Sequence, residues 1–253
     1  MEQGFVKVAS ATPRIRVADP VYNAQVICEQ AKEAAEHGAK IVVFPELCIT
    51  GYTCNDLFLQ ELLLEKAKEA LLTIAEETGQ LETLFLVGLP VDKDGRLYNV
   101  AAVLYRGRIL GMIPKKNIPM YAEFYEGRHF TPGEETVTEY RLGKQVIPFG
   151  SNLLFRCEEL PELILGCELC EDLWVAEPPS TSHALMGATV IANLSASNET
   201  VSKDDYRTLL IKASSARLLC GYIYTSAGEG ESTQDLVFGG CLLYTSPSPR
   251  DCS

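Results

Sequence analysis

The chain has 253 residues, of which 47% are hydrophobic and 22% charged, a composition that predicts a soluble globular protein with one sizeable domain. Its formal net charge is −12, and it has no basic stripe, so nucleic acid and acidic membrane surfaces are excluded as partners. No apolar run approaches the roughly 20 residues of a membrane-spanning helix. The first residues lack the pattern of a signal peptide, so we expect a cytoplasmic protein without membrane contact.

The first third of the chain alternates strands with helices. Apolar runs at 5–10, 41–44 and 84–87 are typical of buried strands. Apolar residues at helical spacing predict two long helices, one over 20–37 and one over 57–78.

The rest of the chain changes character and then returns to this alternation. A hairpin is predicted at 97–113, followed by a long polar loop, rich in aromatic residues, at 114–135. The remaining elements are strands near 137, 146, 153 and 163–166, a strand at 190–194, a helix at 204–219 and a strand at 221–226. This order predicts an α/β layered fold with a mixed sheet.

Polar residues follow several of the predicted strands directly. They are Glu46, Lys115, Cys170, Ser195 and Ser197. Ligands of open α/β sheets bind beyond the carboxyl ends of the strands. We therefore expect these side chains to form one site.

Cys170 is the candidate nucleophile of that site. A thiol that attacks an amide or nitrile carbon needs a base and a cation or N–H donor for the developing oxyanion. The acids that follow Cys170 would disfavour its thiolate, so activation must come from elsewhere. Glu46 can act as the base, Lys115 as the cation, and the backbone N–H of Glu171 as a second donor. Spacing alone does not choose between Lys115 and Lys116, and none of the three histidines follows a predicted strand.

Each of these residues also has a simpler interpretation. A lone cysteine is usually a small buried hydrophobe, and Glu46 alone fits a solvated loop or a helix cap. Cys167 and Cys170 form a C-x-x-C, but no second pair accompanies them, so a zinc or redox site is disfavoured. The nine cysteines are scattered and do not indicate a disulfide framework.

Two further groups stay open at this point. Tyr121, Phe124 and Tyr125 either anchor the long loop or contact a substrate, and Ser195 and Ser197 fit helix caps as well as a site. The Gly-Glu-Gly-Glu run at 228–231 lacks the spacing of a phosphate-binding loop, and its acids would repel phosphate.

Three segments resemble the catalytic segments of the nitrilase (carbon–nitrogen hydrolase) superfamily. They are Phe-Pro-Glu-Leu-Cys-Ile-Thr-Gly-Tyr at 44–52, the Pro-Lys-Lys to Glu-Phe-Tyr-Glu stretch at 114–126, and Cys-Glu-Leu-Cys-Glu-Asp-Leu-Trp at 167–174. Together with the runs at 193–198 and 228–236, they are similar to the glutaminase domain of bacterial glutamine-dependent NAD synthetases.

The resemblance implies a fold and a set of catalytic roles. The fold is a nitrilase-like αββα sandwich of mixed sheets flanked by helices. Glu46 would be the general base, Lys115 the cation that stabilises the tetrahedral intermediate, and Cys170 the nucleophile. Glu123 would match the family's additional acid, which helps to hold the lysine and the substrate.

The resemblance also implies a substrate and partners. Tyr52, Tyr121, Glu171 and Ser197 would recognise glutamine, with Glu171 suited to its α-ammonium group. The reaction would release glutamate and ammonia through a thioester, with no cofactor in this domain. The ammonia would pass to a synthetase domain that uses ATP and magnesium to convert deamido-NAD to NAD, and a homo-oligomer is expected.

The resemblance spans about residues 4–240, and we expect the hydrolase domain at 1–240. Residues 241–253 are unlike the family, so we expect a non-native tail that is disordered or poorly packed, a sheet that lacks closing strands, and no synthetase domain. Two alternatives stay open, a free-standing nitrilase-type amidase with another substrate and a non-catalytic oligomerisation module.

Overall fold

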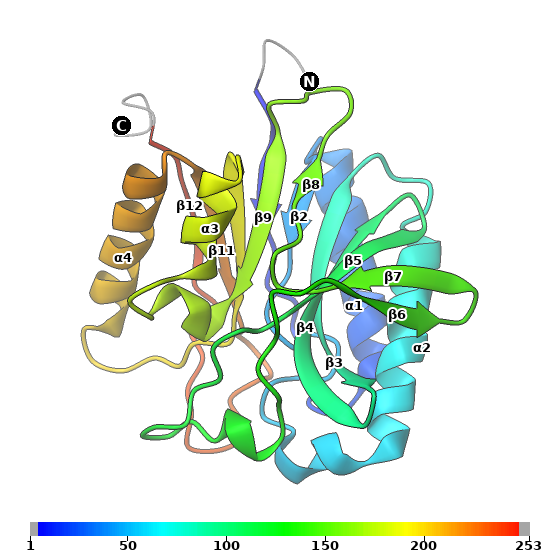
Figure 1. The fold of residues 1–253 in the computed structure, drawn as a ribbon. Coiled ribbons are helices and arrows are strands. Elements are labelled where there is room, and N and C mark those ends of the chain that lie inside the picture. Colours follow the sequence, from blue (N-terminus) through cyan, green and yellow to red (C-terminus); the bar gives the residue numbers. More distant parts are fainter. Residues whose placement is uncertain (1–4, 248–253) are drawn as a thin grey trace.

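The computed structural model describes residues 5–247. Two mixed sheets pack face to face, and two helices cover the outer face of each sheet (Figure 1). This is the four-layer αββα arrangement that the resemblance implies. None of the helices in the described part has the length and apolar character that a membrane span requires.

The larger sheet has seven strands in the order β1-β2-β3-β4-β5-β7-β6. The first three run parallel, and β3, β4 and β5 follow one another as antiparallel hairpins. The bounds are β1 (Val8–Ser10), β2 (Ile41–Val43), β3 (Leu84–Lys93), β4 (Arg96–Tyr105), β5 (Arg108–Pro114), β6 (Thr138–Leu142) and β7 (Gln145–Phe149).

The smaller sheet has five strands in the order β12-β11-β10-β9-β8. Its three central strands are parallel, and both edge strands are antiparallel to their neighbours. The bounds are β8 (Phe155–Arg156), β9 (Ile164–Leu169), β10 (Val190–Ser195), β11 (Gly221–Ser226) and β12 (Leu242–Thr245).

Three apolar cores hold the layers together. The helices α1 (Pro20–Glu36) and α2 (Glu61–Glu77) pack on the larger sheet, and α3 (Pro179–Leu185) and α4 (Lys203–Leu218) pack on the smaller one. The third core lies between the sheets, where residues such as Val43, Leu86 and Leu194 are fully buried. Burial on both faces explains why these strands are continuous apolar runs.

Several local boundaries follow from turn and cap chemistry. Helix α1 begins at Pro20, where the Asp19 side chain accepts the N–H of Tyr22 at 3.1 Å. The turn between β3 and β4 is Asp94-Gly95, with φ of 53° and 70°, the left-handed geometry that suits a two-residue hairpin. The third strand therefore extends to Lys93, beyond the predicted end at residue 87.

Two helices differ from the prediction. The helix predicted from residue 57 begins at Glu61, because Gln60 is extended (φ −90°, ψ 122°) and Asn55–Leu59 form the separate 3₁₀ turn η1. The short helix α3 had no sequence prediction.

The expectation that residues 241–253 are disordered is wrong for the part that the structure describes. Residues Leu242–Thr245 form β12, which pairs with β11 and so covers the edge of the parallel strands. Cys241 and Leu243 pack against the core beneath α4. Leu243 and Thr245 are half-buried and alternate with the exposed Leu242 and Tyr244, the period of two that a strand at a sheet edge shows. Residues 248–253 lie outside the described residues, and so do residues 1–4.

The loops that carry the candidate residues meet at one edge of the two sheets. The loops after β2, β5 and β11 lie together at the bottom of Figure 1. Glu46 follows β2, Lys115 follows β5, and Cys170 follows β9, where it opens the 3₁₀ turn η3 (Cys170–Leu173). The fold therefore brings the predicted strand-end residues to one place.

Candidate active site

Cys170 stands at a strained turn between β9 and η3. Its φ is 42°, in the left-handed region that non-glycine residues seldom adopt, and its side chain is 6% exposed. Burial raises the pKa of the thiol, the charge of Glu46 raises it further, and Lys115 opposes both. The resting thiol is therefore protonated, and attack on a substrate requires a base.

Lys115 forms the centre of a buried charge cluster. Its side chain is fully buried, and Nζ donates to Glu46 Oε1 and to Glu126 Oε1, each at 2.7 Å. Burial alone would lower the pKa of Lys115, but the facing carboxylates of Glu126 and Glu46 hold it well above its ordinary value. The ammonium thus stays charged and has a third N–H to offer to an oxyanion.

Glu46 is held from three directions. Oε1 accepts from Lys115 Nζ and from Asn99 Nδ2, both at 2.7 Å, and Oε2 accepts the backbone N–H of Ala196 at 2.8 Å. The loop that carries Glu46 reaches this place because Gly88 of β3 has no side chain. A Cβ there would lie 2.3 Å from the backbone nitrogen of Leu47.

The expectation that Glu123 holds the lysine is wrong. The 3₁₀ turn η2 (Glu126–Arg128) brings Glu126 beneath the ammonium, and Glu126 is only 5% exposed. Glu123 instead accepts from Asn198 Nδ2 at 2.5 Å and lines the cavity. The loop after Lys115 runs outward before it returns, so eight residues are too few and eleven are required to reach the lysine again. Burial raises the pKa of Glu126, and Lys115 opposes the rise.

The predicted substrate-binding tyrosines have different surroundings. The Tyr52 hydroxyl donates to Glu126 Oε1 at 2.8 Å. Tyr52 is not among the described residues that line the cavity above Cys170. Tyr121 does line it, and its hydroxyl donates to the two carboxylate oxygens of Glu171 at 3.1 and 3.0 Å.

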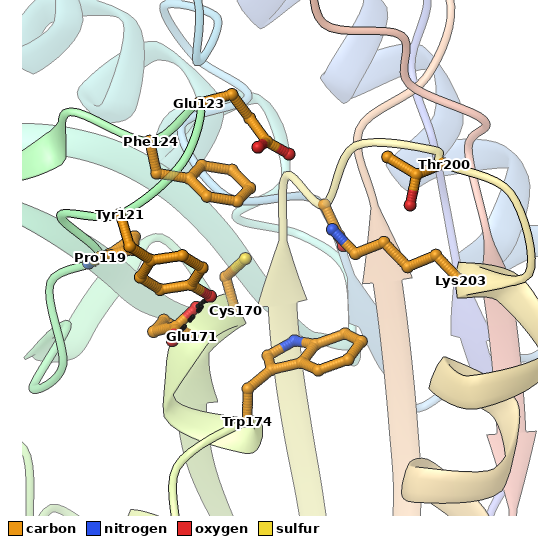
Figure 2. Close-up of a pocket in the computed structure, with 10 residues that line it drawn as sticks. Pro119, Tyr121, Glu123, Phe124, Cys170, Glu171, Trp174, Thr200 and Lys203 are labelled. Carbon is orange, nitrogen blue, oxygen red and sulfur yellow. Dashed lines mark hydrogen bonds between the residues drawn. The ribbon is translucent and has the colours of Figure 1, made fainter.

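A cavity of about 230 Å³ opens above the thiol. Figure 2 shows Tyr121 and Glu171 on one side of Cys170 and Lys203 on the other. The residues that line it are Pro119, Tyr121, Glu123, Phe124, Cys170, Glu171, Trp174, Ser197, Thr200 and Lys203. Three of the four predicted substrate-binding residues are among them. The charged groups of the lining are Glu171, which is bonded to Tyr121, and Lys203 and Glu123, which are both bonded to Asn198.

Lys203, the first residue of α4, had no sequence signal. Its Nζ donates to Asn198 Oδ1 and lies 5.4 Å from the ring centre of Phe124 and 5.6 Å from that of Trp174. Burial lowers the pKa of Lys203. Two aromatic faces keep this cation in place while one side of it faces the cavity.

Asp172 connects the turn that carries the nucleophile to the loop that carries the lysine. Its carboxylate accepts the backbone N–H groups of Leu169 at 3.0 Å and of Asn117 at 2.8 Å. It is 1% exposed, and burial raises its pKa to about 6. These bonds fix the positions of Cys170 and Lys115 relative to each other.

Comparisons with known proteins assign the chain to a family. A sequence model of the carbon-nitrogen hydrolase family matches residues 7–244. The chain belongs to the carbon–nitrogen hydrolase family. Glutamine-dependent NAD(+) synthetases are among its relatives: that of Mycobacterium tuberculosis is 43% identical over 239 residues, and that of Mycobacterium leprae 42% over 238. In each case 94% of this chain matches 35% of the relative, so the carbon–nitrogen hydrolase spans about a third of their length.

Solved structures show the same architecture. A glutamine-dependent NAD(+) synthetase from Cytophaga hutchinsonii superimposes with a TM-score of 0.86 at 28% identity, covering 96% of this chain and 39% of that one. An amidase from Nesterenkonia superimposes with a TM-score of 0.74 at 21% identity, covering 98% of this chain and 84% of that one, and this likeness supports the fold alone. The carbon–nitrogen hydrolase fold predicted from the sequence is thus confirmed.

Proposed function

We propose that this carbon–nitrogen hydrolase domain hydrolyses the side-chain amide of glutamine. The observation that carries the proposal is a buried thiol, lysine and glutamate cluster beneath a cavity that both Glu171 and Lys203 line. Glu171 offers a carboxylate to the α-ammonium group of the substrate, and Lys203 offers an ammonium to its α-carboxylate. The extended side chain between them then brings the amide to Cys170.

The reaction would proceed in two halves. Cys170 Sγ attacks the amide carbon while Glu46 Oε2 accepts the thiol proton, and the oxyanion faces the third N–H of Lys115. The proton then passes to the leaving nitrogen, so ammonia departs and a thioester remains. Glu46 next takes a proton from water, whose oxygen attacks the thioester. Glutamate is released, and the thiol regains its proton.

Glutamate release by the purified chain tests this proposal. We expect release from glutamine that Cys170→Ala abolishes. Cys167→Ala is the matched control, because Cys167 is also buried but faces the core between the sheets. Release that persists in Cys170→Ala, or equal loss in Cys167→Ala, contradicts the proposed nucleophile.

We propose further that the ammonia serves a synthetase domain of a longer protein. The relatives named glutamine-dependent NAD(+) synthetase support this role, since each is about three times as long as the matching segment. In that protein the synthetase domain would bind ATP and magnesium to convert deamido-NAD to NAD. The hydrolysis itself would need no cofactor, because nucleophile, base and cation all come from this chain. Release of glutamate that stops when magnesium is chelated contradicts the last point.

Two further expectations concern surroundings. The eight described cysteines are free thiols, which supports a reducing compartment such as the cytoplasm. Exposed apolar side chains on α3 and α4, including Leu185 at 85% and Leu209 at 64%, support a homo-oligomer. Light scattering tests this expectation, and we expect a mass of at least two chains that Leu209→Glu lowers. A wild-type mass of one chain, which Leu209→Glu does not change, contradicts it.

A further inference from the structure

Asn99 of β4 lies between the two buried carboxylates of the site. It is 1% exposed, and its Nδ2 lies 2.7 Å from Glu46 Oε1 and 3.5 Å from Glu126 Oε2. Its backbone carbonyl accepts the N–H of Lys115 at 2.8 Å. One residue therefore contacts both acids and fixes the main chain of the lysine.

We propose that Asn99 is a positioning residue, which holds the carboxylate of Glu46 turned toward the thiol; this rests on the proposed function. Carboxylates only accept hydrogen bonds, and a carboxamide nitrogen has two N–H groups, one for each acid. A neutral donor is needed here, because Lys115 already supplies the single positive charge that the two acids share.

The orientation of the amide supports this role. Asn99 Oδ1 is buried and has no hydrogen-bond partner among the described residues. Leaving such an oxygen unpaired costs free energy, but a flipped amide would turn that oxygen toward two carboxylates. The side chain therefore leaves its acceptor unused so that its donors face the acids.

The contacts of Asn99 also determine which oxygen of Glu46 acts as the base. Oε1 accepts from Asn99 and Lys115, whereas among the described residues Oε2 accepts only the backbone N–H of Ala196. A carboxylate oxygen accommodates about two hydrogen-bond donors. Oε2 consequently has room for the thiol proton of Cys170.

Removal of the donor has a predictable effect on pH dependence. The titratable groups that face this cluster are Glu46, Glu126, Lys115, Tyr52 and Cys170. A hydrogen bond to an ionised carboxylate favours the ionised form. Without Asn99 Nδ2 the thiol of Cys170 becomes reactive only at a higher pH, and a third carboxylate at this position would raise that pH further.

The test is the rate of Cys170 alkylation by iodoacetamide between pH 5 and 9, read by mass spectrometry of the Cys170 peptide. The variants are Asn99→Leu, which is similar in size and has no donor, and Asn99→Asp, which is isosteric and replaces the donor with a charge. Relative to wild type, we expect the acid limb of the profile to move up by about one to two pH units in Asn99→Leu and further in Asn99→Asp. At a pH below the acid limb of wild type this slows alkylation roughly 10- to 100-fold, since the active fraction there falls tenfold for each pH unit of the shift.

The matched control is Asn23→Leu. Asn23 is fully buried and bonds the main chain of Arg16 and Ile49, so its loss removes hydrogen bonds without touching the acids. We expect its acid limb to coincide with that of wild type. A role in packing alone predicts a normal profile for isosteric Asn99→Asp, and that result overturns the proposal.

Two further outcomes are distinguishable. Alkylation needs no glutamine, so a shifted limb in a chain that does not hydrolyse glutamine supports Asn99 and contradicts the proposed function. If Asn99→Leu does not fold, Asn99→Ala replaces it, since water can enter the smaller side chain's space. Failure of all three Asn99 variants to fold, by circular dichroism, overturns a role specific to the site.

Discussion

Replacing Glu126 with glutamine removes one negative charge from beneath Lys115 and preserves the shape of the side chain. Glu126 is 5% exposed, accepts from Lys115 Nζ at 2.7 Å and accepts from the Tyr52 hydroxyl at 2.8 Å. A bond to a charged acceptor contributes about 1.5–3 kcal/mol and a bond to a neutral one about 0.5–1.5 kcal/mol. The two weakened bonds therefore cost about 2–3 kcal/mol, or roughly 30- to 150-fold in rate if the lysine must be held to meet the oxyanion.

The assay is kcat/KM for glutamate release, and Glu123→Gln is the matched control. Glu123 lies on the same loop and lines the cavity, but its bond is to Asn198 and not to the lysine. We expect Glu126→Gln to lose most of kcat with little change in KM, and Glu123→Gln to keep kcat within about threefold because it leaves the lysine's anchors intact. The reverse order of the two variants refutes the assignment of the second acid.

Three further predictions follow from the same contacts. Burial raises the pKa of Asp172 in the folded protein to about 6, against an ordinary 3.8, so its contribution to stability is present below pH 3.8 and is lost as the pH rises to 6. Asp172→Asn should therefore remove about 3 kcal/mol from the pH dependence of the free energy of unfolding, measured by urea titration at several pH values. A pH dependence equal to that of wild type contradicts this prediction. Glu171→Gln and Lys203→Met should each raise KM for glutamine about tenfold or more with a smaller effect on kcat, and kinetics in which only kcat falls would count against a binding role. Gly88→Ala should lower the melting temperature and activity together, because its Cβ would lie 2.3 Å from the Leu47 nitrogen; a fully active, equally stable variant would contradict this.

The fold could be predicted from local patterns to a large extent. The buried strands are continuous apolar runs, and the helices at 20–36 and 61–77 follow helical spacing, so their order already indicates a layered α/β fold. The short elements could not be found in the same way. Helix α3 and strand β12 form because tertiary neighbours supply what seven and four residues cannot supply alone.

The residues of the candidate site also differ in how far the sequence alone predicts their positions. The strand-end argument brought Glu46 and Lys115 together, and the structure places their charged atoms 2.7 Å apart. The positions of residues on the long loop depend on how that loop returns, so the resemblance indicated Glu123 where the structure places Glu126 beside the lysine. Asn99 and Lys203 lie within a strand and a helix with no local signal, and only the packed molecule shows what they face.

The central claim is that Cys170 forms a thioester with the glutamyl group of glutamine. Acid quenching during turnover, followed by mass spectrometry of the Cys170 peptide, measures it directly. We predict a glutamyl adduct on Cys170 that Glu46→Gln diminishes and that no other cysteine carries. Steady glutamate release without any adduct, continuing when Cys170 is replaced by alanine, would contradict the account.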